Sequence, residues 1–193
     1  MGISRTEAAA ALTDIEQTTG RAQVARGYRI SSPIFMTWGV IWIIGYLAMG
    51  LLPQDRWGEL WIPLDIVGFG ITVVLTRHGH GAAGYGTGRG GAGAGMAWRS
   101  TVFGLTVMAF AAVTFTLFKA VSTDVYLVYP GLICGLIYTL LGVWRMTRFA
   151  VIGVLMFAAS LAGYYLLQPW LAFWMAGVGG VGLLLGGLWM RRA

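Results

Sequence analysis

The run FAVIGVLMFAASLAGYYLLQPWLAFWMAGVGGVGLLLGGLW, residues 149–189, contains two long apolar stretches separated only by Gln168 and Pro169. Each stretch is about 20 residues long, which is the length that a helix needs to cross a ~30 Å hydrocarbon layer. The short break between them predicts a tight helical hairpin, with membrane spans over 149–167 and 170–189.

The composition places the whole chain in the same class. Of the 193 residues, 58% are hydrophobic and only 10% are charged, whereas soluble domains have about 45–50% apolar and about 25% charged residues. Open strands are excluded in lipid, because their backbone groups would lack hydrogen-bond partners. We therefore expect an all-α transmembrane bundle of about six spans, the four others covering 34–52, 57–76, 100–119 and 125–144.

Prolines suggest how the spans are grouped. Pro63 and Pro130 lie near the starts of the second and fourth spans, and Pro169 opens the sixth. Proline is tolerated in the first turn of a helix, so the pattern predicts three helical hairpins in series. The domain organisation expected is an N-terminal arm over 1–33 and a six-helix domain over 34–193, interrupted by a glycine-rich loop over 77–99.

The distribution of basic residues predicts the orientation. All but two of the 13 basic residues fall in the arm, the 77–99 loop, the 145–148 turn or the C-terminus, the exceptions being Arg56 and Lys119. By the positive-inside rule these four segments share the cytoplasmic side. Both termini are therefore expected in the cytoplasm.

The N-terminal arm has the pattern of a short helix. Ser4 and Glu7 have the S-x-x-E spacing of a capping box, which predicts a helix start. Leu12 and Ile15 follow at helical spacing, and Gly20 is the expected stop. The apolar stripe is weak, so lying on the membrane, docking on a partner and remaining solvated stay open as alternatives.

The glycine-rich loop is expected to be a flexible linker. Residues 79–95 read GHGAAGYGTGRGGAGAG, but neither a preceding strand nor a Lys-Ser or Lys-Thr pair supports a phosphate-binding loop. His78 and His80 supply two metal ligands, which are too few without a third group. We expect no metal or cofactor there, and no nucleic-acid partner.

Enzymatic chemistry is disfavoured by what the spans lack. Neither histidine lies in a span, only one span carries an acid, and Cys134 is the single cysteine. Haem ligation by histidine, metalloprotease sites and serine nucleophiles with a histidine base all need such residues. We therefore expect no catalytic residues and no cofactor.

Asp65 is the most informative polar residue of the spans. It lies eight residues after Trp57, which is about 12 Å into the membrane along a helix. A carboxylate at that depth is costly and often marks an ion or proton path, although it can also serve as structural packing glue. The polar site that we expect contains Asp65, Thr72 and Thr76 of the second span and Ser160, Tyr164 and Gln168 of the fifth.

Two G-x-x-x-G steps predict close helix packing. They join Gly131 to Gly135 and Gly182 to Gly186, and small residues at this spacing let helix backbones approach. Contacts within one chain and contacts between chains both remain open.

One stretch resembles a known class of proteins. Residues 28–45, with Pro33 and the run TWGVIWIIGY, are similar to small multi-pass bacterial membrane proteins of unassigned function. The resemblance implies a bacterial inner-membrane location and no mechanism. We therefore expect a non-catalytic interaction, regulatory or accessory subunit, whose partners are the lipid bilayer and either a membrane protein or another copy of the chain. The alternative is a small ion or solute transporter that uses Asp65.

Overall fold

A computed structural model describes residues 4–81, 92–117, 122–144 and 146–192. Every regular element in these ranges is helical, so the all-α prediction is confirmed. Five helices are long and apolar enough to cross a membrane. The elements are α1 (Arg5–Leu51), η1 (Gln54–Arg56), α2 (Trp57–Gly81), α3 (Ala92–Leu117), α4 (Thr123–Trp144), α5 (Thr147–Leu166), η2 (Gln168–Trp170), α6 (Leu171–Met175), η3 (Ala176–Val181) and α7 (Gly182–Arg191).

The third predicted span, 100–119, corresponds to α3. This helix has 26 residues, but the described apolar stretch within it, Gly104–Thr114, is shorter than a full span. A crossing by this helix, and with it the total of six spans, stays a prediction.

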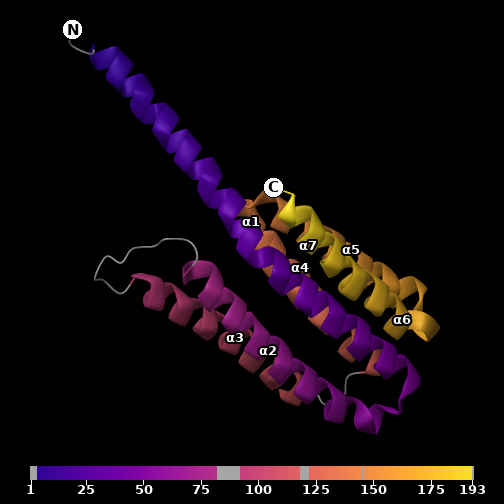
Figure 1. Cartoon of the computed structure of the whole chain (residues 1–193). Helices are drawn as coiled ribbons and strands as arrows, with labels where there is room; N and C mark the ends of the chain where they lie inside the picture. Colours follow the sequence, from indigo (N-terminus) through magenta and orange to yellow (C-terminus); the bar gives the residue numbers. More distant parts are fainter. Residues whose placement is uncertain (1–3, 82–91, 118–121, 145, 193) are drawn as a thin grey trace.

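Helix α1 is the central helix of the bundle, as Figure 1 shows. The α2–α3 hairpin lies along one side of α1, while α4, α5 and the last helix (η2, α6, η3 and α7) lie along the other. Within this second group α4 packs closely along α5, and α7 packs along α1. In a series of three hairpins the third span would pair with the fourth. This pairing is wrong, because α3 lies beside α2 and α4 lies beside α5.

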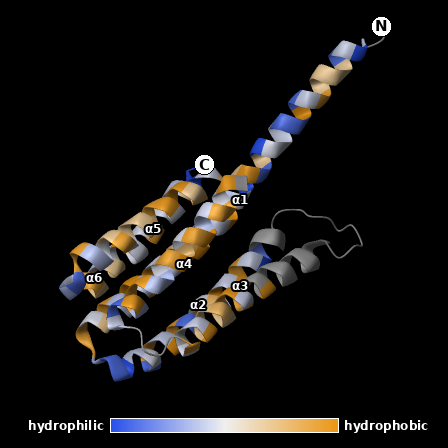
Figure 2. Cartoon of the chain, turned by 180° about the vertical axis from the view of Figure 1, so that it is seen from behind, coloured by the Kyte–Doolittle hydropathy of each residue, from blue (hydrophilic) through white to orange (hydrophobic). Residues whose placement is uncertain are grey.

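The buried core lies between α1 and the group α4–α7. Its most buried side chains come from α1 and from the last helix, and include Tyr46, Leu171, Met175, Leu183 and Met190. Large apolar side chains are also exposed on the outer faces of the membrane helices, and Figure 2 shows that hydrophobic residues recur along these helices. Such an exterior is stable where lipid is the solvent.

The expected division between a short arm helix and a first span is wrong. Helix α1 is a single helix of 47 residues that passes through both Gly20 and Pro33. A glycine costs only about 1 kcal/mol inside a helix, and Gly20 is followed by the good helix formers Arg21, Ala22 and Gln23. Pro33 costs more, but this part of α1 is held by the bundle, where the Ser32 hydroxyl donates to the Gly187 carbonyl at 2.8 Å.

The expected 77–99 loop is shorter than predicted. Helix α2 continues to Gly81 and α3 begins at Ala92, so both flanks of the glycine-rich segment are helical. Alanines alternate with the glycines in 92–95, and alanine is the strongest helix former. The remaining residues, 82–91, lie outside the described ranges, and the linker prediction is untested there.

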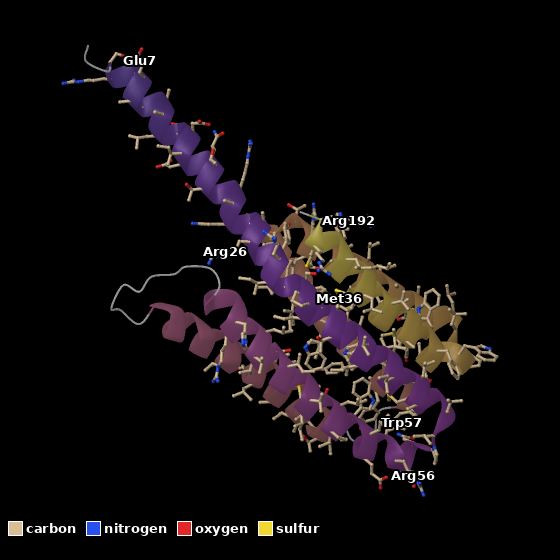
Figure 3. The ribbon with its side chains drawn as sticks, in the orientation of Figure 1. Glu7, Arg26, Met36, Arg56, Trp57 and Arg192 are labelled. Atoms are coloured by element: carbon tan, nitrogen blue, oxygen red, sulfur yellow. The ribbon has the colours of Figure 1, made fainter. Side chains whose placement is uncertain are left out.

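Both chain ends lie at the same end of the bundle. The carbonyl of Trp189, near the C-terminus, accepts a hydrogen bond from the Arg148 guanidinium, and the Tyr28 hydroxyl accepts one from the Arg148 backbone N–H at 3.1 Å. We call this end, which carries Arg29, Arg148, Arg191 and Arg192, the arginine end. The N-terminal part of α1 leaves the bundle from here (Figure 3).

Candidate functional site

The predicted polar site is not assembled as one constellation. Asp65, Thr72 and Thr76 lie on α2, whereas Ser160 and Tyr164 lie on α5 and Gln168 lies in η2. Because α2 and α5 lie on opposite sides of α1 (Figure 1), the two stripes do not face one another. Each stripe must therefore be considered separately.

Asp65 is half-buried on α2 and has no described partner. No hydrogen bond or ion pair joins its carboxylate to any residue in the described ranges. One turn farther along α2, a Cβ added to Gly68 would lie 2.6 Å from the Ile41 Cδ1 atom of α1. The α2 face next to Asp65 is therefore packed directly against α1.

The two threonines below Asp65 have structural partners. The Trp38 indole N–H donates to the Thr72 hydroxyl oxygen at 3.0 Å, which ties α1 to α2. Thr72 in turn donates to the Gly68 carbonyl, and Thr76 donates to the Thr72 carbonyl. These contacts support the structural interpretation of both residues.

Ser160 is the most enclosed polar residue of the predicted set. Its side chain is completely buried, and its hydroxyl has no hydrogen-bond partner among the described residues. The hydroxyl oxygen points at Gly131, where an added Cβ would collide with it and with the Met175 methyl group. Tyr164 is half-buried and packs on Tyr165, while Gln168 is exposed at the end of the bundle opposite to the arginines.

Three of the four predicted packing glycines make close contacts, all within the chain. Added Cβ atoms would strike Ser160 at Gly131, the Phe157 backbone at Gly135, and the Ile152 side chain at Gly186. Gly182 makes no close contact within the chain, since no atom lies within 4 Å of an added Cβ there, and its packing against another chain stays a prediction. The π-helical turn η3, which ends at Val181, changes which face the residues after it present.

Sequence reasoning missed a close backbone contact between α1 and the last helix. A Cβ on Gly39 would lie 2.8 Å from the Gly180 carbonyl oxygen, and a Cβ on Gly180 would lie 3.0 Å from the Gly39 carbonyl oxygen. One heptad away on each helix, Ser32 bonds to Gly187. The seven-residue spacings Ser32–Gly39 and Gly180–Gly187 were the available signal.

The described residues contain no group of three or more histidine, cysteine, aspartate or glutamate side chains that could hold a metal ion. The His78 ring is 2.8 Å from the Val74 carbonyl oxygen within its own helix. His80 has no described side chain, so the two-histidine hypothesis lies outside the described residues.

The projecting part of α1 is a continuous exposed helical surface. All side chains from Ser4 to Thr19 are exposed, among them Leu12 at 61% and Ile15 at 62%. We call residues 5–23 the projecting arm. At 1.5 Å per residue it extends for about 28 Å beyond the bundle (Figures 1 and 3).

The arm begins at a complete capping box, as the sequence predicts. The Ser4 hydroxyl accepts a hydrogen bond from the Glu7 N–H at 3.2 Å, and the Glu7 carboxylate accepts one from the Ser4 N–H at 2.9 Å. Such a cap satisfies two backbone donors that a free helix end would leave unpaired. The sequence therefore specifies a helical arm up to its tip.

Charge is unevenly distributed along the arm. Glu7, Asp14 and Glu16 lie with Arg5 within residues 5–16, which we call the tip, whereas Arg21 lies closer to the bundle, followed by Arg26 and Arg29 at the bundle. The arm thus has an acidic tip, a basic base, and a narrow apolar stripe formed by Leu12 and Ile15.

No known protein family, curated protein or solved structure matches this chain.

Proposed function

We propose that the protein is a non-catalytic, membrane-anchored docking protein of the bacterial inner membrane. Its helix bundle holds the projecting arm in the cytoplasm, where the arm binds the basic, amphipathic segment of a partner protein. The observation that carries this proposal is the arm itself: a capped, fully exposed helix that continues directly into the core of the bundle.

The basic residues support the sidedness of this proposal. Arg29, Arg148, Arg191 and Arg192 all lie at the end from which the arm leaves. Basic residues next to membrane spans favour the cytoplasmic side. The arm and the C-terminus are therefore assigned to the cytoplasm.

The charges of the arm favour a protein partner over the membrane surface. The cytoplasmic leaflet is negatively charged and attracts basic segments, so it attracts the base of the arm and repels the tip. A helix that lies in the interface also needs a broad apolar face and a basic polar face. Leu12 and Ile15 are too few for the first, and Glu7, Asp14 and Glu16 oppose the second.

The same charges disfavour pairing between two arms in one membrane. Two copies in the same bilayer present their arms in parallel, which places acidic tip beside acidic tip and basic base beside basic base. Like charges at this range repel. A partner with lysines or arginines around a small apolar groove complements both the carboxylates and the Leu12–Ile15 stripe.

A photo-crosslinking amino acid at Leu12 in the full-length protein tests the proposal in cells. We expect a discrete adduct with a protein, and we expect mass spectrometry to place the crosslink in a segment rich in lysine or arginine. The triple variant Glu7→Gln, Asp14→Gln and Glu16→Gln should remove most of this adduct without changing the melting temperature of the bundle. The same crosslinker at Leu52, at the opposite end of the bundle, is the matched control.

An adduct with lipid, or with a second copy of the chain, contradicts the docking proposal. So does an adduct that persists in the triple variant, since the acidic tip then plays no part in recognition.

The observation that favours transport as a second candidate function is the half-buried Asp65 carboxylate, which has no described partner at membrane depth. If Asp65 carries a proton or an ion, Asp65→Asn should abolish flux in proteoliposomes while the variant stays folded. Asp124→Asn, near the bundle end, is the control. Wild-type flux in Asp65→Asn vesicles rejects transport through this residue.

A further inference from the structure

The arginine end contains a guanidinium group held between two aromatic rings. The Cζ atom of Arg148 lies 5.2 Å from the centroid of the Tyr28 ring and 5.1 Å from that of the Trp189 ring. The Nη1 atom donates to the Trp189 carbonyl, and the Arg148 backbone N–H donates to the Tyr28 hydroxyl. Three helices, α1, α5 and α7, therefore fix the position of this side chain.

Most of the hydrogen-bonding capacity of this group remains unused within the described residues. A guanidinium carries five N–H donors, and one of those of Arg148 donates to the Trp189 carbonyl. Its carbonyl contact caps the C-terminal end of α7, which is a structural role. The remaining donors are available to an anion.

Further arginines lie near the residues that hold this group, and the acidic side chains of the chain lie elsewhere. Arg29 directly follows Tyr28, while Arg191 and Arg192 follow Trp189, and all three are exposed. The seven acidic residues of the chain lie elsewhere: in the outer arm, at the opposite end of the bundle, or midway along α2. The nearest along α1 is Glu16, ten residues and about 15 Å from Arg26. The described part of this end is thus rich in arginines and contains no acidic side chain.

We propose that Arg148, with Arg29, Arg191 and Arg192, forms a binding site for the phosphate of an anionic phospholipid headgroup. The site lies where the apolar parts of α1, α5 and α7 end, so a lipid can place its chains along the helices and its phosphate among the arginines. Guanidinium groups recognise phosphate oxygens through paired N–H donors. Basic pockets between transmembrane helices on the cytoplasmic side suit such headgroups. The first turn of α5, which contains Arg148, adds the positive end of a helix dipole.

Native mass spectrometry of the full-length protein in nanodiscs tests this site. We expect one phosphatidylglycerol molecule to be retained, and phosphatidylcholine of the same chain length to be lost. In the exposed double variant Arg191→Gln and Arg192→Gln, retention should fall by about fivefold for each charge removed. Arg148→Gln should have a larger effect, and Arg148→Lys should restore only part of it, because lysine lacks the planar donors.

Arg56→Gln at the opposite end is the matched control and should retain lipid like the wild type. Soluble glycerol phosphate distinguishes a headgroup alone from a membrane lipid, and it should not displace the retained molecule at millimolar concentration. Displacement by glycerol phosphate, equal retention of phosphatidylcholine, or unchanged retention in the double variant would overturn the proposal. The double variant keeps the test valid even if Arg148→Gln fails to fold, since neither Arg191 nor Arg192 contributes to the buried core.

Discussion

On one side of α1 the last helix comes close enough for backbone contact, whereas on the other side α2 is held mainly by side chains. In the most apolar 18-residue stretch of the last helix 50% of the residues are buried, whereas in the corresponding stretch of α2 only 6% are. Gly39 and Gly180 meet through their backbones on the first side. On the second side, Trp38 bonds to Thr72 and packs edge-on against Phe69, and Trp61 bonds to the Met49 sulfur.

The difference shows how helices associate when lipid surrounds them. Apolar side chains gain little by leaving lipid for each other, so close packing at small residues and hydrogen bonds provide the attraction. The α4–α7 side uses many close glycine contacts, while the α2–α3 side relies on a few aromatic anchors. We therefore expect the first side to resist unfolding and the α2–α3 hairpin to detach first.

The largest expected effect comes from filling a glycine contact on the tight side. Gly153→Leu places a branched side chain against the Thr139 backbone N–H and the Gly135 carbonyl. Overpacking typically costs about 1–3 kcal/mol, and backbone atoms on both helices leave little room to relax, so we expect an effect at or above about 3 kcal/mol. Melting in detergent measures it.

Gly182→Leu is the matched control for this substitution. It adds the same side chain on a neighbouring helix where an added Cβ meets nothing within 4 Å. A melting temperature that drops equally in both variants would contradict the contrast between filled and open glycine positions.

A smaller effect is expected from breaking an aromatic anchor of the hairpin. Thr72→Val keeps the side-chain shape but removes the acceptor of the Trp38 indole N–H. Hydrogen bonds between membrane helices average about 0.6 kcal/mol, with a maximum of about 1.7. Hydrogen exchange should increase in α2 and α3 but stay unchanged in α4–α7, and a uniform increase would mean that the two sides unfold together.

The smallest expected effect compares two buried serines on the tight side. Ser32 donates to the Gly187 carbonyl, whereas the Ser160 hydroxyl has no described partner. Ser32→Ala should lower stability by about 0.6 kcal/mol, while Ser160→Ala should be neutral or slightly stabilising, since an unpaired buried hydroxyl contributes nothing. Chemical denaturation in detergent compares the two, and a larger loss from Ser160→Ala would reveal a partner for that hydroxyl.

The sequence alone determined the class of the fold and most of its helix positions. Apolar runs of membrane-spanning length specify helices wherever lipid excludes water, because only helices satisfy their own backbone there. The predicted 125–144 and 149–167 spans lie within two residues of α4 and α5 at each end. The helix start at Ser4 could also be predicted from the local sequence, because a capping box depends on only four consecutive residues.

Only the tertiary structure decided which helices are neighbours and which residues face each other. The predicted site joined Asp65 with Ser160 because both are polar at membrane depth, yet α1 lies between their helices. The continuation of α1 through Pro33 likewise depends on its contacts with the last helix, and the orientation of Gly182 depends on the π-helical turn before it. Helical periodicity gives each residue an angle around its own axis, but the partner on that face is set by packing between segments far apart in the chain.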